Sequence, residues 1–331
     1  MKEHLLSVEN LRMSYLTREG KVPAVDGVSF RLSRGETYGI LGESGCGKTS
    51  LASSLLRILP DNAVIAGGSI IFRDKDILRI PEEEMRKLRW AGISMVFQAA
   101  MNALNPVYTV EYQIAEAMRA HGKGLTRGSA EAKILEVFKM AGLTPDIMKK
   151  YPHQLSGGMK QRAVIAMALS CDPDLIIADE PTTALDVIVQ DRILRNLKKI
   201  QAKLNTAMIY ISHDVSVLAE VSNRLAVMYA GKIVEEASAS GIFSRPLHPY
   251  TLGLMSAFPS IRGEKKKLSA VPGEPPDLIN PPPGCRFHPR CPRAVPGCAS
   301  EEPAYIEHSS GHYAACFNTV SGGDSRERND S

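Results

Sequence analysis

The sequence lacks a long hydrophobic run. Its most apolar stretch, residues 163–169, is soon followed by Asp172 and Pro173, whereas a membrane-spanning helix needs about 20 consecutive apolar residues. The first 15 residues carry acidic side chains and Arg12 where a signal peptide needs an uninterrupted apolar stretch. We therefore expect a chain that is not exported and that reaches a membrane only through other chains.

A strong excess of charge of either sign is lacking as well. The 331 residues include 40 basic and 36 acidic ones, for a formal net charge of +4. So mild a balance gives no reason to expect a nucleic-acid partner. The apolar fraction of 44% is that of an ordinary globular protein, and a chain of this length is expected to form two or so compact domains.

Short apolar patterns predict a sheet. Alternating patterns over residues 5–15 and 28–41 are typical of strands, and four continuous apolar runs are typical of strands buried on both faces. These runs are residues 93–97, 175–179, 207–211 and 225–229. Because helical patterns separate most of them, the core is expected to be α/β. Residues 229–232 (YAGK) predict a tight hairpin turn.

Between residues 98 and 158 the pattern changes to one typical of helices. Residues 110–121 and 129–141 are amphipathic, the second segment with Ser129 as candidate N-cap and Gly142 as stop. We therefore expect a helical insertion in the sheet domain.

A glycine-rich motif lies between a predicted strand, residues 36–41, and a predicted helix, residues 49–59. It fits the GxxxxGK[ST] pattern of phosphate-binding loops. Its residues are Gly42, Glu43, Ser44, Gly45, Cys46, Gly47, Lys48 and Thr49, followed by Ser50. The glycines let backbone N–H groups turn inward around phosphates, and the helix directs its positive end at the same charge. Lys48 is expected to reach the outer phosphates of a nucleotide, and the Thr49 hydroxyl to hold Mg²⁺.

A pair of acidic residues follows one of the predicted buried strands. Residues 174–179 end in Asp179, and Glu180 comes next. Burial of the strand fixes the position of Asp179, as a second Mg²⁺-directed carboxylate requires, and Glu180 is a candidate to polarise the attacking water. Together with the phosphate loop, this pair favours a nucleotide hydrolase.

A second anion site is predicted at residues 155–162, which read LSGGMKQR. Ser156 is a good N-cap, and Gly157 and Gly158 expose backbone N–H groups at the start of a helix that runs to Leu169. One chain therefore carries two half-sites for phosphate.

The segment 155–162 resembles the signature sequence of the ATP-binding cassette (ABC) family, and residues 1–237 resemble the nucleotide-binding domain of that family nearly end to end. The resemblance implies a P-loop (RecA-like) α/β fold with an antiparallel β subdomain and a helical insertion. It also implies that two cassettes pair head to tail. In such a pair, Ser156, Gly157, Gly158 and Gln161 of one cassette close over the Mg-ATP held by the phosphate loop of the other.

The same resemblance assigns roles to four further residues. Tyr15 is placed to stack on adenine, and Gln98 to contact Mg²⁺ and to sense the permease. Asp186 is placed to bridge the dimer, and His213 to contact the γ-phosphate. Since every acidic and polar position needed for hydrolysis is present, a hydrolysing cassette is expected.

The composition shifts near residue 237, and residues 238–320 predict a small, loop-rich C-terminal metal-binding module because prolines are frequent there. Four of the six cysteines have the spacing C-x5-C-x6-C-x17-C, namely Cys285, Cys291, Cys298 and Cys316. Soft thiolates gathered in this way predict Zn²⁺ or an iron–sulfur cluster. The spacing does not choose between them, and His288, His308 and His312 leave mixed ligation open. The polar residues 321–331 are expected to be disordered.

Residues 248–251 (HPYT) and 282–292 (PPGCRFHPRCP) resemble the C-terminal extension of the oligopeptide/dipeptide branch of ABC importers. Some members of that branch carry a [4Fe-4S] cluster on four such cysteines. The resemblance therefore implies a [4Fe-4S] cluster on the four C-terminal cysteines, with Zn²⁺ as the alternative, beside ATP and Mg²⁺ at the phosphate loop.

Membership of this branch implies several partners. They are two integral membrane permease subunits, a second ABC ATPase subunit (a paralogue rather than an identical copy), and, indirectly, an extracytoplasmic substrate-binding protein. The chain is then peripheral, at the cytoplasmic face of the inner membrane. Di- or oligopeptides are the expected cargo, with oligosaccharides or nickel as alternatives. ATPases of DNA repair carry much longer insertions than residues 98–155, and cassette proteins of translation usually carry two cassettes in one chain.

Overall fold

The computed structural model describes residues 4–98, 103–121, 127–183, 185–257 and 271–320. The chain divides into two compact units. Unit 1 consists of Met1–Leu6, Arg31–Thr37 and Ile71–Ile211, and unit 2 of Ser7–Phe30, Tyr38–Ile70 and Ser212–Ser331. No helix in the described part of the chain is both long and apolar enough to cross a membrane. The tail expected to be disordered, residues 321–331, lies outside the described residues.

Unit 1 contains a parallel sheet. Its strands, in the order β6-β7-β8, are β6 (Ile93–Val96), β7 (Leu175–Asp179) and β8 (Ala207–Ser212). Leu175 of β7 lies opposite Ile93 on one side and Ala207 on the other. Every residue of β7 and β8 is buried, which explains why these strands appear in the sequence as continuous apolar runs. All three predicted strands are confirmed to within one residue.

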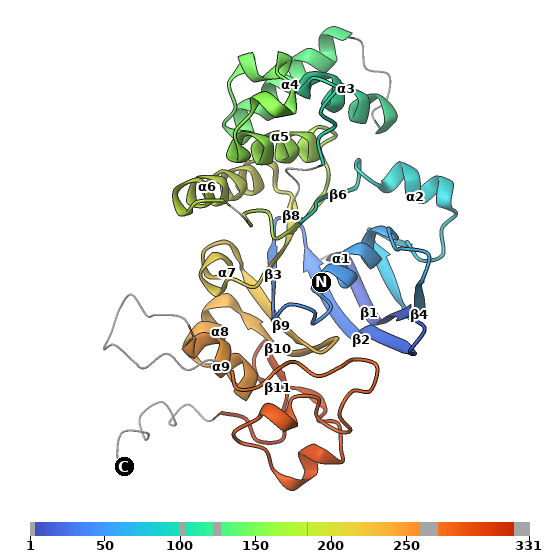
Figure 1. Ribbon diagram of the computed structural model, residues 1–331, viewed down its shortest axis with the longest axis vertical. Coiled ribbons are helices and arrows are strands. Elements are labelled where there is room, and N and C mark those ends of the chain that lie inside the picture. Colours follow the sequence, from blue (N-terminus) through green and yellow to red (C-terminus); the bar gives the residue numbers. More distant parts are fainter. Residues whose placement is uncertain (1–3, 99–102, 122–126, 184, 258–270, 321–331) are drawn as a thin grey trace. The chain divides into compact units, whose positions relative to one another are not determined.

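The helices of unit 1 include the predicted insertion. Their bounds are α2 (Glu82–Leu88), α3 (Val110–His121), α4 (Arg127–Ala141), α5 (Gly157–Leu169) and α6 (Val187–Leu204), with short turns η2 (Pro145–Lys149) and η3 (Pro152–Gln154). Helices α3, α4 and α5 pack against one another (Figure 1). Gly142, with φ of 71°, follows α4 as predicted. The N-cap assigned to Ser129 is wrong, because α4 already begins at Arg127.

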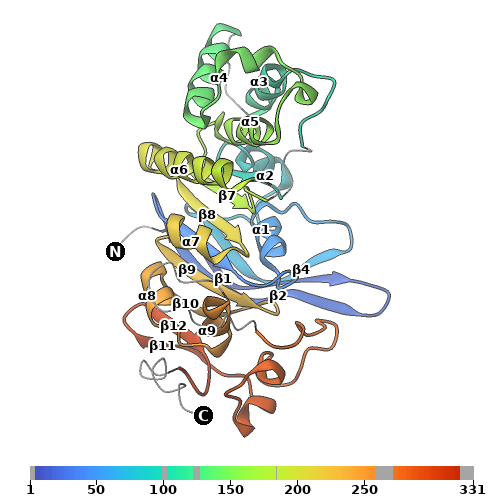
Figure 2. The ribbon, with the colours of Figure 1, turned by 60° about the vertical axis from the view of Figure 1, so that its left-hand side comes forward.

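A second sheet lies mostly in unit 2. It contains β1 (His4–Leu16), β2 (Lys21–Ser33) and β4 (Ala63–Phe72) in the order β2-β1-β4, and these long strands are seen side by side in Figure 2. Hydrogen bonds between Thr17 and Gly20 close the hairpin that joins β1 to β2. The last residues of β4 belong to unit 1, where Ile71 and Phe72 pair with β5 (Lys75–Asp76). This sheet corresponds to the antiparallel β subdomain expected from the sequence.

The other sheet of unit 2 supports the phosphate loop. Parallel strands β3 (Thr37–Leu41) and β9 (Arg224–Tyr229) are followed across the sheet by β10 (Lys232–Ser238), β12 (His312–Ala315) and β11 (Tyr305–Ser309). The predicted hairpin turn is confirmed between β9 and β10, where Ala230 and Gly231 both have positive φ. The helices of this unit are α1 (Lys48–Leu56), α7 (Val215–Val221), α8 (Ala239–Ser244) and α9 (Pro249–Ser256).

The C-terminal region is loop-rich, as predicted, from residue 271 to residue 304. It contains only the short turns η4 (His288–Arg290) and η5 (Pro296–Ala299). Strand β12 then pairs with β10, which places Glu235 opposite Ala314. The predicted boundary near residue 237 therefore falls inside strand β10, which pairs with both β9 and β12, and the division of the chain at that point stays a prediction.

A buried carboxylate holds the start of the C-terminal region to β10. Glu235, which is fully buried, accepts hydrogen bonds from the backbone N–H groups of Leu247 and His248 at 2.7 and 2.8 Å. Its Oε1 also lies 2.7 Å from Nε2 of His312 on β12. Two other segments of the chain therefore converge on the Glu235 side chain, and each supplies polar partners for a group that would otherwise be buried alone.

Candidate functional site

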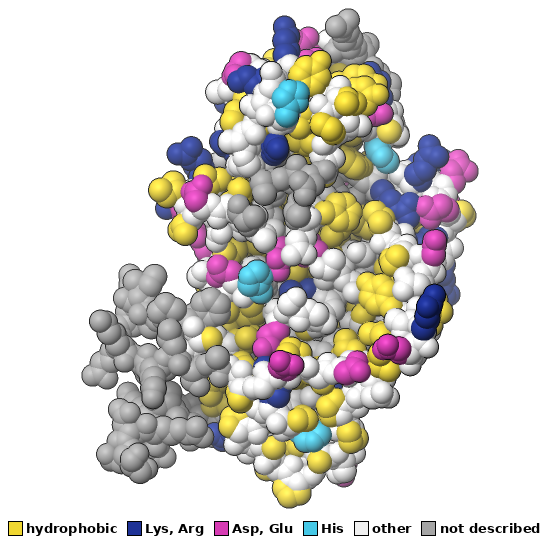
Figure 3. All heavy atoms as spheres, in the orientation of Figure 1, with side chains coloured by type: hydrophobic (Ala, Val, Ile, Leu, Met, Phe, Trp, Pro, Cys, Tyr) yellow, Lys and Arg dark blue, Asp and Glu magenta, His cyan; other side chains and the backbone are white. Residues whose placement is uncertain are grey.

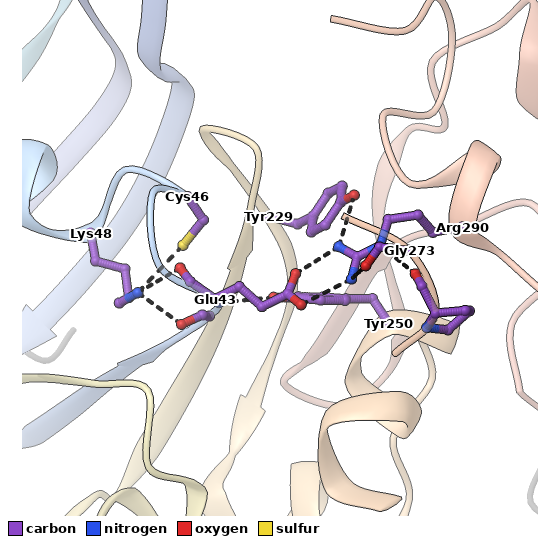
Figure 4. Close-up of polar contacts among 9 residues, drawn as sticks. Glu43, Cys46, Lys48, Tyr229, Tyr250, Gly273 and Arg290 are labelled. Carbon is purple, nitrogen blue, oxygen red and sulfur yellow. Dashed lines mark hydrogen bonds and ion pairs between the residues drawn. The ribbon is translucent and has the colours of Figure 1, made fainter. Parts of the chain in front are cut away.

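The phosphate loop of unit 2 runs from β3 into α1, as the sequence predicted. Lys48, the first residue of α1, is only 6% exposed. Its Nζ donates hydrogen bonds to the carbonyl oxygens of Gly42 and Glu43, both at 2.8 Å, and lies 3.7 Å from Sγ of Cys46 (Figure 4). The lysine is thus folded back along its own loop. Thr49 is exposed at the start of the helix, where its hydroxyl is accessible to a cation.

Two glycines of the loop are required by the backbone around them. Gly47 has φ of 103°, and a Cβ atom added there would lie 2.0 Å from the carbonyl oxygen of Ala24. At Gly42, an added Cβ would lie 2.3 Å from the carbonyl oxygen of Met228. Both obstacles are backbone atoms, so a side chain at either position would displace the loop itself.

Other predicted nucleotide contacts lie beside the loop. The hydroxyl of Tyr15 is 3.0 Å from Oγ of Ser50, which brings the predicted adenine-stacking residue to the first turn of α1. Cys46 is buried, and burial raises the pKa of its thiol above the usual range. Its role is therefore that of a small packed side chain rather than a nucleophile.

Unit 1 carries the acidic residues predicted for hydrolysis. Asp179, at the end of β7, is 1% exposed, and Glu180 follows it at the edge of the sheet. Nε2 of Gln98 donates a hydrogen bond of 3.0 Å to Oε2 of Glu180, and Oγ1 of Thr183 donates another at the same distance. The structure thus brings Gln98 and Glu180 into direct contact.

Glu180 also has an unusual backbone conformation. Its φ is 45°, in the left-handed region that non-glycine residues seldom occupy. Its N–H donates to the carbonyl oxygen of Ile211 at 2.9 Å, which holds it in this conformation. A strained backbone of this kind persists only where the surrounding structure holds it in place, and such residues cluster at functional sites. Here the strained residue is Glu180, whose carboxylate accepts hydrogen bonds from Gln98 and Thr183.

The signature segment has both exposed and buried members. Ser156 caps α5, since its Oγ accepts from the N–H of Met159 at 3.3 Å. Ser156 and Gly157 are exposed, whereas Gly158 and Gln161 are buried. An added Cβ at Gly158 would lie 2.6 Å from Cγ1 of Val189 on α6. Gly158 therefore has a packing role between two helices in addition to the phosphate role predicted for it.

Two more predicted residues lie at helix starts. Asp186 caps α6 by accepting a 2.9 Å hydrogen bond from the N–H of Val189, which explains its place without excluding a role in a dimer. His213 is exposed in unit 2. The next residue, Asp214, caps α7. The backbone N–H of Asp214 donates to Oγ of Ser212 at 2.9 Å, which fixes the backbone beside His213. The roles predicted for Asp186 and His213 toward a nucleotide stay predictions.

The four C-terminal cysteines occupy one neighbourhood in unit 2. Burial raises the pKa of Cys285, Cys291 and Cys316, the last to about 11, and the other cysteines of the set raise these pKa values further. Yet no three His, Cys, Asp or Glu side chains of the described residues are placed to hold a metal ion. The expected metal-binding character of this module is therefore not shown, and ligation by His312 conflicts with its contact to Glu235.

Comparison with known proteins shows the family to which the chain belongs. Residues 25–183 match the family described as ABC transporter, and residues 234–298 match the family described as oligopeptide/dipeptide transporter, C-terminal region. The dipeptide transport ATP-binding protein DppD of Bacillus subtilis is 47% identical over 319 residues, which cover 95% of this chain and 95% of that protein. The chain belongs to the ATP-binding proteins of peptide ABC transporters. This ABC cassette is therefore an ATPase.

Further relatives agree with this membership. The oligopeptide transport ATP-binding protein OppD of Escherichia coli is 44% identical to this cassette over 96% of the chain and 94% of its own length. Among solved structures, a dimeric ATP-binding cassette in a post-hydrolysis state, bound to ADP and phosphate, superimposes with a TM-score of 0.64 at 26% identity, over 71% of this chain and 98% of its own. A component of the cbiONQ ABC transporter complex of Clostridium perfringens has a TM-score of 0.62 at 27% identity, over 73% and 91%.

The sequence did not predict the two residues that hold Glu43 of the phosphate loop in place. Tyr250 and Arg290, both from the C-terminal region, contact Glu43 of the loop. Neither belongs to a phosphate-binding pattern, and more than 200 residues separate each from Glu43. The only signal was their place in the two segments that resemble the C-terminal extension of peptide importers.

Proposed function

We propose that this cassette drives uptake of dipeptides or oligopeptides through two integral membrane permease subunits, from the cytoplasmic face of the inner membrane. The observation that carries the proposal is a likeness over 95% of the chain to a transport ATP-binding protein named for dipeptides, and the likeness includes the C-terminal region. A substrate-binding protein outside the membrane would deliver the peptide. The second ATPase subunit is proposed to be a paralogue rather than an identical copy.

Each of the candidate site residues has a separate proposed role in binding or hydrolysing ATP. Lys48 and the loop N–H groups hold the phosphates, Tyr15 stacks on adenine, and His213 contacts the γ-phosphate. Ser156 and Gly157 of the facing cassette close over the nucleotide, and Asp186 bridges the pair. Glu180, oriented by Gln98 and Thr183, accepts the proton of the attacking water.

The donors proposed for Mg²⁺ suit that ion. The hydroxyl of Thr49 and the carboxylate of Asp179 are hard oxygen ligands, which Mg²⁺ prefers, and Asp179 is fixed by burial in β7. When bound, Mg²⁺ neutralises charge on the phosphate oxygens. Gln98 is proposed as a further contact to the ion, and its hydrogen bond to Glu180 connects that contact to the proton acceptor.

We further propose that Cys285, Cys291, Cys298 and Cys316 hold a [4Fe-4S] cluster rather than Zn²⁺. The pKa values of Cys285, Cys291 and Cys316 are each raised by other cysteines of the set, which indicates that these thiols lie near one another, and a [4Fe-4S] cluster takes four cysteine ligands. The choice of iron–sulfur over zinc rests on the resemblance of residues 282–292 to the C-terminal extension of peptide importers. Protein purified without oxygen should be brown and should bleach on reduction, whereas a colourless sample with one zinc per chain would exclude the cluster.

A strain deleted for this chain tests the cargo. With the cassette supplied from a plasmid, uptake of labelled dipeptide should return, and with the Glu180→Gln variant it should not. Normal dipeptide uptake by the deletion strain, with loss of labelled nickel or oligosaccharide uptake instead, would replace the peptide proposal by one of those cargoes.

A further inference from the structure

The phosphate loop contains an acidic residue, whose charge opposes the binding of an anion. The pattern GxxxxGK[ST] leaves position 43 open, and here it is Glu43, whose carboxylate carries the same sign of charge as the phosphates of ATP. An unpaired carboxylate in this loop would repel them. Something in the structure must therefore compensate for Glu43 if the loop is to bind nucleotide tightly.

Arg290 provides that compensation. Its Nη1 and Nη2 donate to the two carboxylate oxygens of Glu43 at 2.7 and 2.9 Å, a bidentate ion pair (Figure 4). Arg290 is only 8% exposed and the side chain of Glu43 is 26% exposed, so the pair is partly buried and is screened less than a surface pair. Charge-assisted bidentate pairs of this kind are among the strongest side-chain contacts and fix both partners in orientation.

The guanidinium is itself held from every side. Nε donates to the carbonyl oxygen of Pro272 at 2.7 Å, and Nη2 donates to that of Gly273 at 3.1 Å. Nη1 also lies 3.3 Å from the hydroxyl of Tyr229, whose ring the guanidinium covers at 5.7 Å. These contacts fix the guanidinium of Arg290 independently of its ion pair with Glu43.

The polar groups of Glu43 are all engaged at once. The backbone N–H donates to the hydroxyl of Tyr250 at 3.0 Å, the carboxylate accepts from Arg290, and the backbone carbonyl accepts from Nζ of Lys48 at 2.8 Å. Tyr250 is fully buried and packs on Tyr229 and Phe287. The C-terminal region thus fixes one of the two loop residues whose carbonyl oxygens orient the phosphate-binding lysine.

The C-terminal region also borders the loop nearby. A cavity of about 110 Å³ is lined on one side by loop residues 43–46 and on the other by Pro275, Pro276 and Leu278. Arg290 lies between Cys285 and Cys291 in the sequence. The same short segment therefore supplies two of the clustered cysteines and the partner of Glu43.

We propose that Arg290 is a positioning residue for ATP binding: it neutralises Glu43 and, through that residue, orients Lys48. This inference rests on ATP binding at the phosphate loop and does not depend on which cargo is transported. It assigns the C-terminal region a direct part in nucleotide affinity. If Arg290 acts by neutralising Glu43, its loss should weaken binding of Mg-ATP more than binding of Mg-ADP. A contact that only stabilises the fold should affect both nucleotides alike.

The test compares nucleotide affinity in the full chain for wild type, Arg290→Met, Glu43→Gln and the double variant. Dissociation constants for Mg-ATP and Mg-ADP are measured by isothermal titration. Arg290→Met leaves Glu43 unpaired beside the phosphates, so affinity for Mg-ATP should fall about tenfold, with a smaller loss for Mg-ADP because that ligand carries less charge. The double variant carries no unpaired carboxylate, so it should recover the part of the loss that repulsion between Glu43 and the phosphates causes.

A matched control separates this effect from loosening of the C-terminal region. Arg286 belongs to the same segment but pairs with Asp26, so Arg286→Met should leave nucleotide affinity within about twofold of wild type. Near-ultraviolet circular dichroism and the thermal midpoint report whether each variant is folded.

Each result either supports or overturns the proposal. Rescue by Glu43→Gln supports it, even if Arg290→Met alone is unstable, because the rescue is measured on the double variant. Unchanged affinity in folded Arg290→Met overturns it, as does a double variant that binds no better than Arg290→Met, or an equal loss in Arg286→Met. If wild type itself binds no Mg-ATP, the assigned ATPase function fails rather than the role of Arg290 alone.

Discussion

Acid should weaken the attachment of the C-terminal region through His248. This side chain is 1% exposed and caps α9, since its Nδ1 accepts from the N–H of Tyr250 at 3.1 Å. Burial lowers the pKa of His248 to about 4 from its usual 6.5, although the nearby charge of Glu235 acts in the opposite direction. Protonation would place a charge in the core and also remove the capping acceptor.

The sign and size of the effect follow from this depressed pKa. The unfolded chain binds the proton first as the pH falls, so the stabilisation is present above pH 6.5 and is lost between pH 6.5 and about 4. One unit of pKa corresponds to about 1.4 kcal/mol. The loss on acidification from pH 7.5 to pH 4.5 should therefore be about 2 to 3 kcal/mol of unfolding free energy.

His248→Asn is the matched variant, because an Asn side chain keeps a capping oxygen but does not titrate. Urea unfolding of both proteins at pH 7.5, 6.0 and 4.5 gives the two pH profiles. Any packing lost in the variant lowers its unfolding free energy by the same amount at each pH. The neighbouring titratable groups Glu235 and His312 are present in both proteins, so their contribution to the pH profile is common to both. The wild-type profile should fall more steeply than that of the variant. Parallel profiles would refute the assignment of the acid-sensitive step to His248.

Three further substitutions test other parts of the structure. Lys48→Ala removes the phosphate-binding amine and should abolish binding of Mg-ATP in isothermal titration; undiminished affinity would contradict the role of Lys48. Gly47→Ala combines strain of about 1–3 kcal/mol at a positive φ with a clash against the carbonyl oxygen of Ala24, and should lower both the thermal midpoint and ATP affinity; a normal midpoint would show that the loop adapts. Gly158→Ala should lower the thermal midpoint through its clash with Val189, and Gly158→Ala/Val189→Ala should recover part of the loss; no recovery would argue against that packing contact.

The sequence predicts best where the physical cause is local. Strands β6, β7 and β8 are predicted to within a residue because both of their faces are buried. The phosphate loop is contiguous and needs glycine at fixed positions, so its pattern and its structure coincide. In the same way Ser156 is confirmed as an N-cap, because its partner lies three residues away.

Prediction fails where distant residues decide the outcome. Nothing near Glu43 in the sequence indicates its ion pair with Arg290, 247 residues later. The buried role of Gly158 depends on Val189 of another helix, and the pairing of β12 with β10 joins a segment that composition alone separates at residue 237. Ser129 is a different failure: a residue suited to capping lies inside a helix that had already begun at Arg127.

The distribution of charge on the surface agrees with the modest net charge. On the face drawn in Figure 3, described Lys and Arg side chains are interspersed with Asp and Glu.

The most direct test of the account is the rate of Mg-ATP hydrolysis when Glu180 is replaced by Gln in the cassette assembled with its companion subunits. The Gln98 hydrogen bond to residue 180 and the positive-φ backbone remain possible in this variant, so ATP should still bind with near-normal affinity. Loss of the proton acceptor should lower turnover by about 100-fold or more. Wild-type turnover by Glu180→Gln would contradict the assignment of Glu180 as the residue that activates water.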